Sequence, residues 1–346
     1  MTRAGPPPVG VGQLRAVLAG SNSTAGWLAH LERIGPTPGG PVLPAPGHAV
    51  EALLDLAVPH EEIDPLLRWM PDPHATPGVW WLLDRVAHSV IATIGTATAP
   101  PPFPELTAAL GVFARYFHLY VILAVVPHTA GYYARLGIPE AVLRHTMADV
   151  GREFAVHRKD FGSSGLASPF WLTRHLRGRL FALGRLQYDL TPLAREPELA
   201  AAIIAAGLPV DPSETAVSIH IPDFAGPLSP AACQASLASA RPFFDRYFRR
   251  RRVRYGLLWS WVLDPQLRHY LGDGTNLADF QRRFRLIDHP NPDNPGTLRF
   301  LFGRVGTDPT GLPRETSLQR AVLDHILGGG QWQAGGGWLA LPTTSA

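Results

Sequence analysis

Residues 216–230, AVSIHIPDFAGPLSP, decide the fold of the second half of the chain. The branched run Ala216–Ile221 predicts a strand, and Pro222–Leu228 is rich in turn-forming residues. Ser229 then predicts a helix N-cap, with Pro230 at the first helical position. A strand that leads through a glycine-containing turn into a helix N-terminus binds phosphate groups in many proteins. The same pattern is also typical of an ordinary strand-to-helix connection.

One side chain and four loop positions in this stretch are candidates for chemistry. His220 ends the strand, and an imidazole there can accept a proton from an attacking amine. The same histidine equally fits a half-buried strand residue that is hydrogen-bonded to the backbone. The residues that would surround a bound pyrophosphate are Ile221, Asp223, Gly226 and Ser229.

Outward from this stretch, short strand-like runs alternate with helical patterns after about residue 160. The predicted strands are Leu180–Leu190, Ala216–Ile221, Arg254–Val262, Phe284–Ile287 and Thr297–Val305. The predicted helices are Leu193–Ala206, Pro230–Phe248, Pro265–Leu271, Leu277–Arg283 and Glu315–Leu327. Because the interval between the last two strands is short, we expect them to form an antiparallel pair.

The first half of the chain reads as helical throughout, with apolar residues at three- and four-residue spacing. The predicted helices are Val11–Leu18, Trp27–Arg33, Ala49–Leu56, Ile63–Met70, Val79–Ile94, Pro104–Val126 and Pro139–Val156. The two halves together predict an α+β protein. We expect an all-helical N-terminal domain at residues 1–160 and a mixed-sheet domain with flanking helices at residues 161–346.

The aromatic run Trp259-Ser260-Trp261 closes the third predicted strand. In a strand, Trp259 and Trp261 lie on one face and the Ser260 hydroxyl on the other. That hydroxyl is suited to hydrogen-bond a substrate carbonyl or a water that relays protons. The pattern fits equally well a tryptophan pair in the core with Ser260 as a polar neighbour.

A dense run of charge, Arg249–Arg252 with Arg254, precedes the same strand. Arg250 and Arg252 in this run fit a clamp for cofactor phosphates, and charge runs are also typical of solvated loops. Nucleic acid is not favoured as a partner, because the net charge is only +3.

Composition excludes several classes of protein. The 346 residues are 46% hydrophobic, which is enough to form a core, and the single cysteine excludes an internal disulfide framework or a multi-cysteine metal site. The 14 histidines show no HxH or HExxH spacing, so we expect no metal. Patterns for a nucleophile elbow, a P-loop or a dinucleotide fingerprint are also missing.

The start has no apolar signal region, and the most apolar run, Leu119–Val126, is shorter than the ~20 residues of a membrane span, so we expect a cytoplasmic protein.

Several longer segments occur together in a familiar order. They are Trp171–Gly178, Leu180–Tyr188, Val217–Pro222, Gly226–Cys233, Ala240–Phe244, Ser260–Leu267, Thr275–Asn276, Phe280–Phe284 and the closing stretch Leu312–Val322. In these segments the chain resembles the bacterial acyltransferases that are built from a helical N-terminal domain and a GNAT-like C-terminal domain. The resemblance covers nearly the whole chain from about residue 15.

This resemblance implies a GNAT-like fold and an acyl-CoA or acyl-carrier thioester as donor. The donor pyrophosphate would lie at Ile221–Pro230, although the Q/R-x-x-G-x-G/A form of that turn is missing here. His220 matches the family's His-Ile-Pro segment, so His220, or a water that it positions, would be the base when an amine attacks the thioester. An acyl carrier protein and a small-molecule acyl acceptor are the implied partners.

One departure from the family pattern concerns Leu258–Trp261, where relatives commonly read Cys-His-Ser-Trp. Without that histidine, the remaining catalytic candidates are His220, Ser260 and Tyr255. The substrate pocket would be more aromatic, with its lining drawn from Trp259, Trp261, Gln187 and Arg185. We therefore predict transfer of an acyl group to the nitrogen or oxygen of a small metabolite in specialised metabolism. The alternatives are a thioester hydrolase or cyclase, and a protein that binds acyl-CoA without catalysis.

Overall fold

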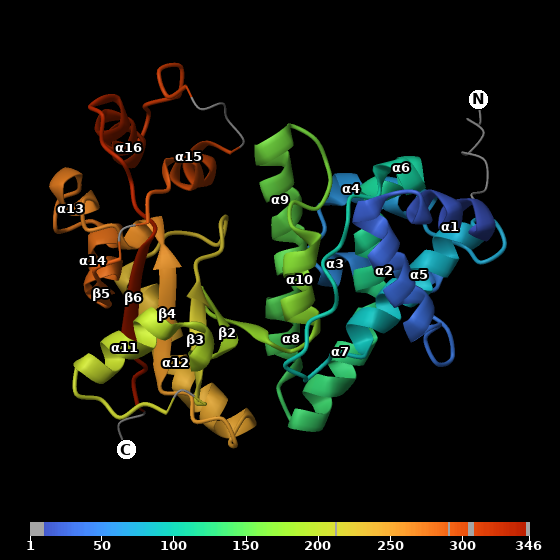
Figure 1. The fold of residues 1–346 in the computed structure, drawn as a ribbon, viewed down its shortest axis with the longest axis horizontal. Helices are drawn as coiled ribbons and strands as arrows, with labels where there is room; N and C mark the ends of the chain where they lie inside the picture. The colour runs from blue at the N-terminus through green and yellow to red at the C-terminus, as the bar shows by residue number, and fades with distance from the viewer. Residues whose placement is uncertain (1–9, 212, 290, 304–307, 344–346) are drawn as a thin grey trace. The chain divides into compact units, whose positions relative to one another are not determined.

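The computed structural model describes residues 10–211, 213–289, 291–303 and 308–343. The chain divides into two compact units, which Figure 1 shows in blue to green and in yellow to red. The first unit runs to Arg158 and includes Gly162–Arg179, and the second comprises Lys159–Phe161 and the residues from Leu180 onward. The predicted domain boundary at residue 160 stays a prediction; contacts group Gly162–Arg179 with the helical unit.

The first unit is helical, as the apolar spacing predicts. Its helices are α1 (Val11–Ala19), α2 (Asn22–Ile34), α3 (Pro46–Asp55), α4 (His60–Arg68), α5 (Pro77–Ile91), α6 (Thr107–Leu110), the 3-10 helix η1 (Gly111–Arg115), α7 (Phe117–Leu136), α8 (Glu140–Met147), α9 (Asp149–Phe161) and α10 (Pro169–Leu176). The long predicted helix Pro139–Val156 is two helices, because the chain turns at Ala148 between α8 and α9.

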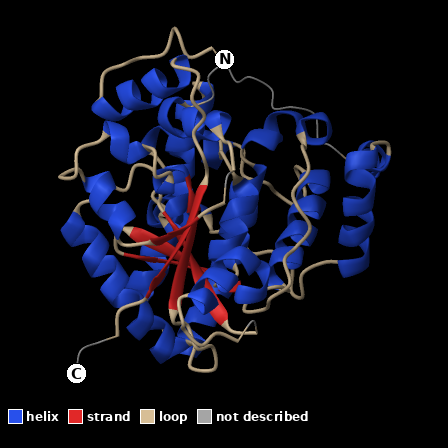
Figure 2. Cartoon of the chain, turned by 60° about the vertical axis from the view of Figure 1, so that its left-hand side comes forward, coloured by secondary structure: helices blue, strands red, loops and turns tan. Residues whose placement is uncertain are grey.

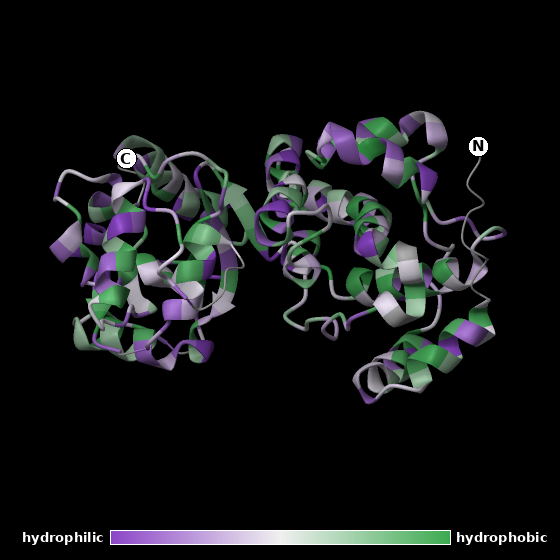
Figure 3. Ribbon diagram, turned by 90° about the horizontal axis from the view of Figure 1, so that it is seen from above, coloured by the Kyte–Doolittle hydropathy of each residue, from purple (hydrophilic) through white to green (hydrophobic). Residues whose placement is uncertain are grey.

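Helix α7 supplies much of the core of this unit. Its residues 119–125 are all buried, and the neighbouring core residues come from α1, α2 and α5. Apolar and polar residues interleave along the outer helices, which is the pattern of amphipathic helices (Figure 3). Among the described residues, no helix combines the length and the apolarity that crossing a bilayer requires.

The second unit is built on a six-stranded mixed sheet (Figure 2). Its order is β1-β2-β3-β4-β6-β5, and within this sheet β3 and β4 are the parallel neighbours. The strands are β1 (Leu180–Leu183), β2 (Leu186–Pro192), β3 (Thr215–His220), β4 (Tyr255–Ser260), β5 (Arg285–Ile287) and β6 (Gly335–Ala340). The helical segments are η2 (Leu193–Arg195), α11 (Pro197–Ala205), α12 (Pro230–Tyr247), η3 (Trp261–Leu263), α13 (Leu267–Tyr270), α14 (Asn276–Arg282), α15 (Asn294–Phe302) and α16 (Ser317–Leu327). The α+β prediction is confirmed.

One strand prediction and one pairing prediction were wrong. In the predicted strand Thr297–Val305, residues 297–302 belong to α15, which Asp293 caps by accepting a hydrogen bond from the Gly296 amide at 2.9 Å, and residues 304 and 305 lie outside the described residues. The antiparallel pair expected there does not form, and β5 pairs instead with β6. Sequence reasoning missed β6 because its first residues are three glycines, which are rare in strands.

The predicted strand Leu180–Leu190 is a hairpin of β1 and β2, joined by Gly184 and Arg185. Gly184 has φ +75°, the left-handed conformation that tight two-residue hairpin turns require.

Two helices cover opposite faces of the sheet. On one face, Phe181 of β1 packs against Phe243 and Phe244 of α12, with ring centroids 5.1 and 5.9 Å apart. On the other face, Ala216 of β3 and Leu257 of β4 share a cluster with α11. Successive side chains of a strand point to opposite faces, and this alternation determines which face α12 covers. It also determines the direction in which the β3–α12 loop leaves the sheet.

His118 on α7 makes stability depend on pH. Its ring stacks on Phe103 at 4.7 Å, and its Nε2 is buried without a hydrogen-bond partner among the described residues. Burial lowers the pKa of His118 from 6.5 to about 4, against an opposite effect of Glu105. Between these pH values the unfolded chain binds a proton that the folded chain does not, so stability falls as the pH drops from about 6.5 towards 4.

We expect His118→Phe to remove this pH-dependent contribution to the free energy of unfolding. Between pH 7 and pH 5 the wild type should lose about 2 kcal/mol more unfolding free energy than the variant, which urea titrations at both pH values would measure. Equal losses in the two proteins would contradict the prediction.

Candidate active site

The candidate site begins where β3 and β4 separate. The two strands pair only at Val217 with Gly256 and at Ser218 with Leu257. In the described sheet their last residues, from Ile219 and Leu258 onward, do not pair with each other. The carboxyl ends of parallel strands meet at one edge, the usual place for ligands in such sheets. The facing edges of β3 and β4 beyond Ser218 and Leu257 are therefore the candidate place for a ligand.

The loop between β3 and α12 continues from this edge. Ser229 caps α12 by accepting a hydrogen bond from the Ala232 amide at 3.3 Å, which confirms the predicted N-cap. Gly226 has φ +82°, and Phe224 has φ +56°, which is unusual and costly for an aromatic residue. The dipole of this 18-residue helix favours anions at its N-terminus, although Pro230 has no N–H and the Ala232 N–H is already bonded to Ser229.

Arg185, in the turn between β1 and β2, braces this loop. Its guanidinium donates to the carbonyl oxygens of Pro222 and Pro227, each at 3.3 Å. These residues lie at the two ends of the loop, so one side chain closes it. The structure thus places Arg185 beside the predicted phosphate loop, and its role in the substrate pocket stays a prediction.

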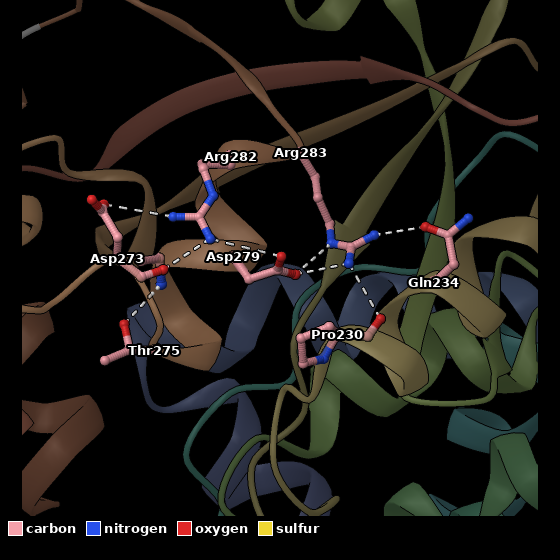
Figure 4. A network of polar contacts seen from close by, with 8 residues as sticks. Pro230, Gln234, Asp273, Thr275, Asp279, Arg282 and Arg283 are labelled. Carbon is pink, nitrogen blue, oxygen red and sulfur yellow. Dashed lines mark hydrogen bonds and ion pairs between the residues drawn. The ribbon is translucent and has the colours of Figure 1, made fainter.

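A second arginine, which sequence reasoning missed, lies at the first turns of α12 (Figure 4). Arg283 donates to the Pro230 carbonyl at 3.2 Å and to the Gln234 side chain at 2.7 Å, and it pairs with Asp279 at 2.8 Å. The motif Phe280–Phe284 contained this residue, but nothing in its spacing pointed to α12.

The buried thiol of Cys233 lies close enough to both arginines for their charges to act on its pKa. Burial raises the pKa of Cys233, and Arg283 and Arg185 act in the opposite direction. The thiol therefore stays protonated and serves as packing, while two guanidinium groups lie near the N-terminal turns of α12.

Polar side chains gather on the sheet face that carries His220. The β2–β3 register places Gln187 opposite His220 and Asp189 opposite Ser218, so all four share one face. Gln187 and Asp189 are buried. His220 and Gln187, predicted from the sequence for different roles, are thus brought together.

Trp259 lies on the same face, at the end of β4. Its indole N–H donates to the Glu196 carboxylate at 2.8 Å, and its ring lies where a side chain at Gly336 would be. His220 and Trp259 therefore stand on the two strands that separate. Glu196 is a further residue that the sequence did not suggest.

The other two predicted catalytic residues lie elsewhere. Ser260 alternates to the opposite face, where its oxygen accepts a hydrogen bond from the Val262 amide at 3.3 Å. Tyr255 is buried in the α11 cluster at the start of β4, five residues, or about 16 Å, before Ser260. Trp261 leaves the strand for η3, where it packs near Phe300 at 5.5 Å.

Arg250 and Arg252 are exposed and follow the C-terminal end of α12. The helix has 18 residues, or about 27 Å, so these arginines lie at the end away from the β3–α12 loop. No group of three or more His, Cys, Asp or Glu in the described residues is arranged to hold a metal ion.

Comparison with known proteins identifies the family. Residues 48–178 match the N-acyltransferase N-terminal domain, and residues 180–339 match the GNAT-like C-terminal domain. A solved acyltransferase in complex with decanoyl-CoA and teicoplanin is 35% identical, with 96% of this chain and 99% of that chain covered and a TM-score of 0.83. The chain belongs to the GNAT-like acyltransferases.

Two further solved relatives of this acyltransferase cover the same shares, 96% of this chain and 99% of theirs. One, in complex with decanoyl-CoA, is 32% identical with a TM-score of 0.84, and the other, a mutant in complex with octanoyl-CoA, is 34% identical with a TM-score of 0.83. Comparison with curated protein sequences gave no match. The family resemblance seen in the sequence is confirmed.

Ser236 fixes α12 of the acyltransferase to the hairpin that carries Arg185. Its hydroxyl donates to the Leu183 carbonyl, accepts from the Leu186 amide at 3.2 Å and lies 3.0 Å from the Tyr188 hydroxyl. We expect Ser236→Ala to lower the free energy of unfolding by about 2 kcal/mol, because several buried polar groups lose a partner. Denaturant titration measures this. The exposed Ser239→Ala on the same helix should change stability by less than about 0.5 kcal/mol, and equal losses in both variants would refute the assignment.

Proposed function

We propose that this acyltransferase transfers the acyl group of an acyl-CoA to an amine or hydroxyl of a small molecule in specialised metabolism. The observation that carries the proposal is the separation of β3 from β4 beside His220 and the β3–α12 loop. Relatives aligned over almost the whole chain bind octanoyl-CoA, decanoyl-CoA and teicoplanin, which supports a thioester donor and a small-molecule acceptor. An acyl carrier protein as donor stays a prediction.

The donor would be held by backbone groups and by the start of α12. Its diphosphate fits the β3–α12 loop, where the helix N-terminus favours negative charge and Arg185 fixes the loop shape. The pantetheine amides would hydrogen-bond to the open edges of β3 and β4. This arrangement brings the thioester to the end of β3, next to His220.

The reaction then needs one base and one oxyanion site. The acceptor nitrogen or oxygen attacks the thioester carbonyl, and the His220 imidazole, directly or through a water, takes the proton that it loses. Backbone N–H groups at the open strand edge would stabilise the tetrahedral oxyanion. The C–S bond then breaks, and the proton returns to the thiolate of CoA.

Thioester hydrolysis is a second candidate, and Trp259 favours it. The family commonly has histidine at this position. In this chain the Trp259 indole donates a hydrogen bond to Glu196 and cannot act as a base. If His220 activates water in place of an acceptor, free thiol appears without any acceptor. Measuring thiol release with and without an acceptor therefore separates hydrolysis from transfer.

The first test uses the compounds named for the relatives. Octanoyl- and decanoyl-CoA are incubated with teicoplanin and with simpler amines, and the acylated product is detected by mass spectrometry alongside free CoA. Acceptor-dependent CoA release with a matching acylated product supports the proposal. No CoA binding, and no thiol release with any donor, would refute it.

His220 provides the mutational test of the base. His220→Ala should lower kcat at least ~100-fold, the usual scale for a general base, without loss of CoA binding. The matched control is His74→Ala, because His74 is exposed on a loop of the helical unit. Turnover of His220→Ala near that of the control would reject the assignment.

Arginine substitutions test where the phosphates bind. Arg185→Ala should raise the KM for acyl-CoA about tenfold with a smaller effect on kcat, because the loop loses its brace at Pro222 and Pro227. The double variant Arg250→Ala/Arg252→Ala should leave the KM unchanged, since both residues are exposed beyond the far end of α12. If steady-state kinetics instead showed a raised KM for the double variant and an unchanged KM for Arg185→Ala, the phosphates would bind at the arginine run.

A further inference from the structure

We propose that Lys159 is a positioning residue for the donor phosphates. It neutralises the Asp223 carboxylate on the β3–α12 loop and ties that loop to α15. This inference rests on the proposed function, because it assumes that the loop holds the phosphates of CoA. Lys159 is the single lysine of the chain, beside 30 arginines, and it belongs to the sheet-containing unit.

The Lys159 ammonium contacts two polar groups and two aromatic rings. Its Nζ lies 3.1 Å from Asp223 Oδ2 and donates to the Phe300 carbonyl oxygen at 2.6 Å. It also lies 5.9 Å from the ring centroid of Phe224 and 5.7 Å from that of Phe300, within the range of cation–π attraction. One charge thus links the loop to helix α15.

The backbone around Lys159 is fixed independently of its side chain. The neighbouring Asp160 is buried and pairs with Arg299 of α15 at 3.1 Å. At the end of α15, Gly303 passes so close that an added Cβ would lie 2.8 Å from the Lys159 carbonyl oxygen. Because these contacts hold the backbone at Lys159, the ammonium reaches Asp223 at a smaller entropic cost than from a mobile segment.

Charge explains why the loop needs this ammonium. Asp223 places a carboxylate in a loop that, under the proposed function, receives a diphosphate. A bare carboxylate about 6 Å from a phosphate, at an effective dielectric constant near 20, would weaken binding by up to about 100-fold. Lys159 cancels that charge, and both side chains are only about a quarter exposed, which limits screening by solvent.

The ammonium also supports an unfavourable backbone conformation. Phe224 has φ +56° and its side chain is 63% exposed, so packing of the ring against the core does not hold it there. The attraction between its ring and the Lys159 ammonium holds Phe224 in this conformation, together with the ion pair at the adjacent Asp223. The strained loop therefore depends on Lys159 as well as on Arg185, and the ion pair that neutralises Asp223 comes from Lys159.

The test compares two donors, acyl-CoA and the matching acyl-pantetheine, which carries no phosphate. Lys159→Met should raise the KM for acyl-CoA and the Kd for CoA about 10- to 100-fold, with kcat within a few-fold and with acyl-pantetheine kcat/KM unchanged. Lys159→Arg should retain most of the affinity. Adding Asp223→Asn to Lys159→Met should restore CoA binding, because the uncompensated charge is then gone.

The matched control is Arg254→Met, which removes an ion pair with Glu214 of similar length, 2.8 Å, at the start of β4. It should leave the KM for acyl-CoA unchanged. If Lys159→Met binds CoA as the wild type does, or if acyl-pantetheine kinetics suffer equally, the inference is wrong. If the wild type itself neither binds CoA nor releases thiol, it is the proposed function that fails.

A measurement on the wild type covers the case in which Lys159→Met does not fold. Because the chain has one lysine, an amine-reactive reagent labels one internal site, which peptide mass spectrometry identifies. Saturating CoA should slow the labelling of Lys159 at least about tenfold, while pantetheine should not. Labelling that is unaffected by CoA would overturn the inference.

Discussion

The candidate site depends on the short parallel pairing of β3 and β4. Two residue pairs hold the strands together, and beyond Ser218 and Leu257 each strand follows a different neighbour. β3 stays in register with β2 up to His220, and β4 stays in register with β6 up to Ser260. The opening is therefore built from well-paired strands and needs no flexible segment. Two neighbouring strands can therefore part from each other while each keeps its pairing with the strand on its other side.

The sequence predicted the elements whose signals are local. The N-cap at Ser229, helix α12 and the helical first half depend on neighbouring residues and on periodicity, and all are found. The failures have two causes, a distant contact for β6 and an unrecognised local cap for α15. Strand β6 begins with three glycines because the Trp259 ring and the backbone at Leu263 come within contact distance of them, and no local pattern encodes that approach. Thr297–Phe302 has strand-like composition, and its helix is set by the Asp293 cap before it.

The candidate site shows the same limit. His220 and the loop after it are contiguous in sequence and could be recognised as one unit. Arg185 and Lys159 contact the β3–α12 loop and Arg283 contacts the start of α12, each from a separate part of the chain, so only the folded structure shows them as a group. The arginine run was conspicuous in the sequence, yet it follows the other end of the helix. A cluster along the chain is therefore a weak guide to a cluster in space.

The contact between Trp259 and Gly336 limits the order in which this pocket could have evolved. A Cβ at position 336 would lie 2.6 Å from the indole ring, so glycine had to be present there before tryptophan could replace a smaller residue at position 259. The reverse order would pass through an intermediate with overlapping atoms in the middle of the sheet. A smaller residue at position 259 alone does not make room for alanine or serine opposite it, because a Cβ at position 336 would also lie 2.9 Å from Ile287 Cγ1, so positions 259, 287 and 336 should vary together.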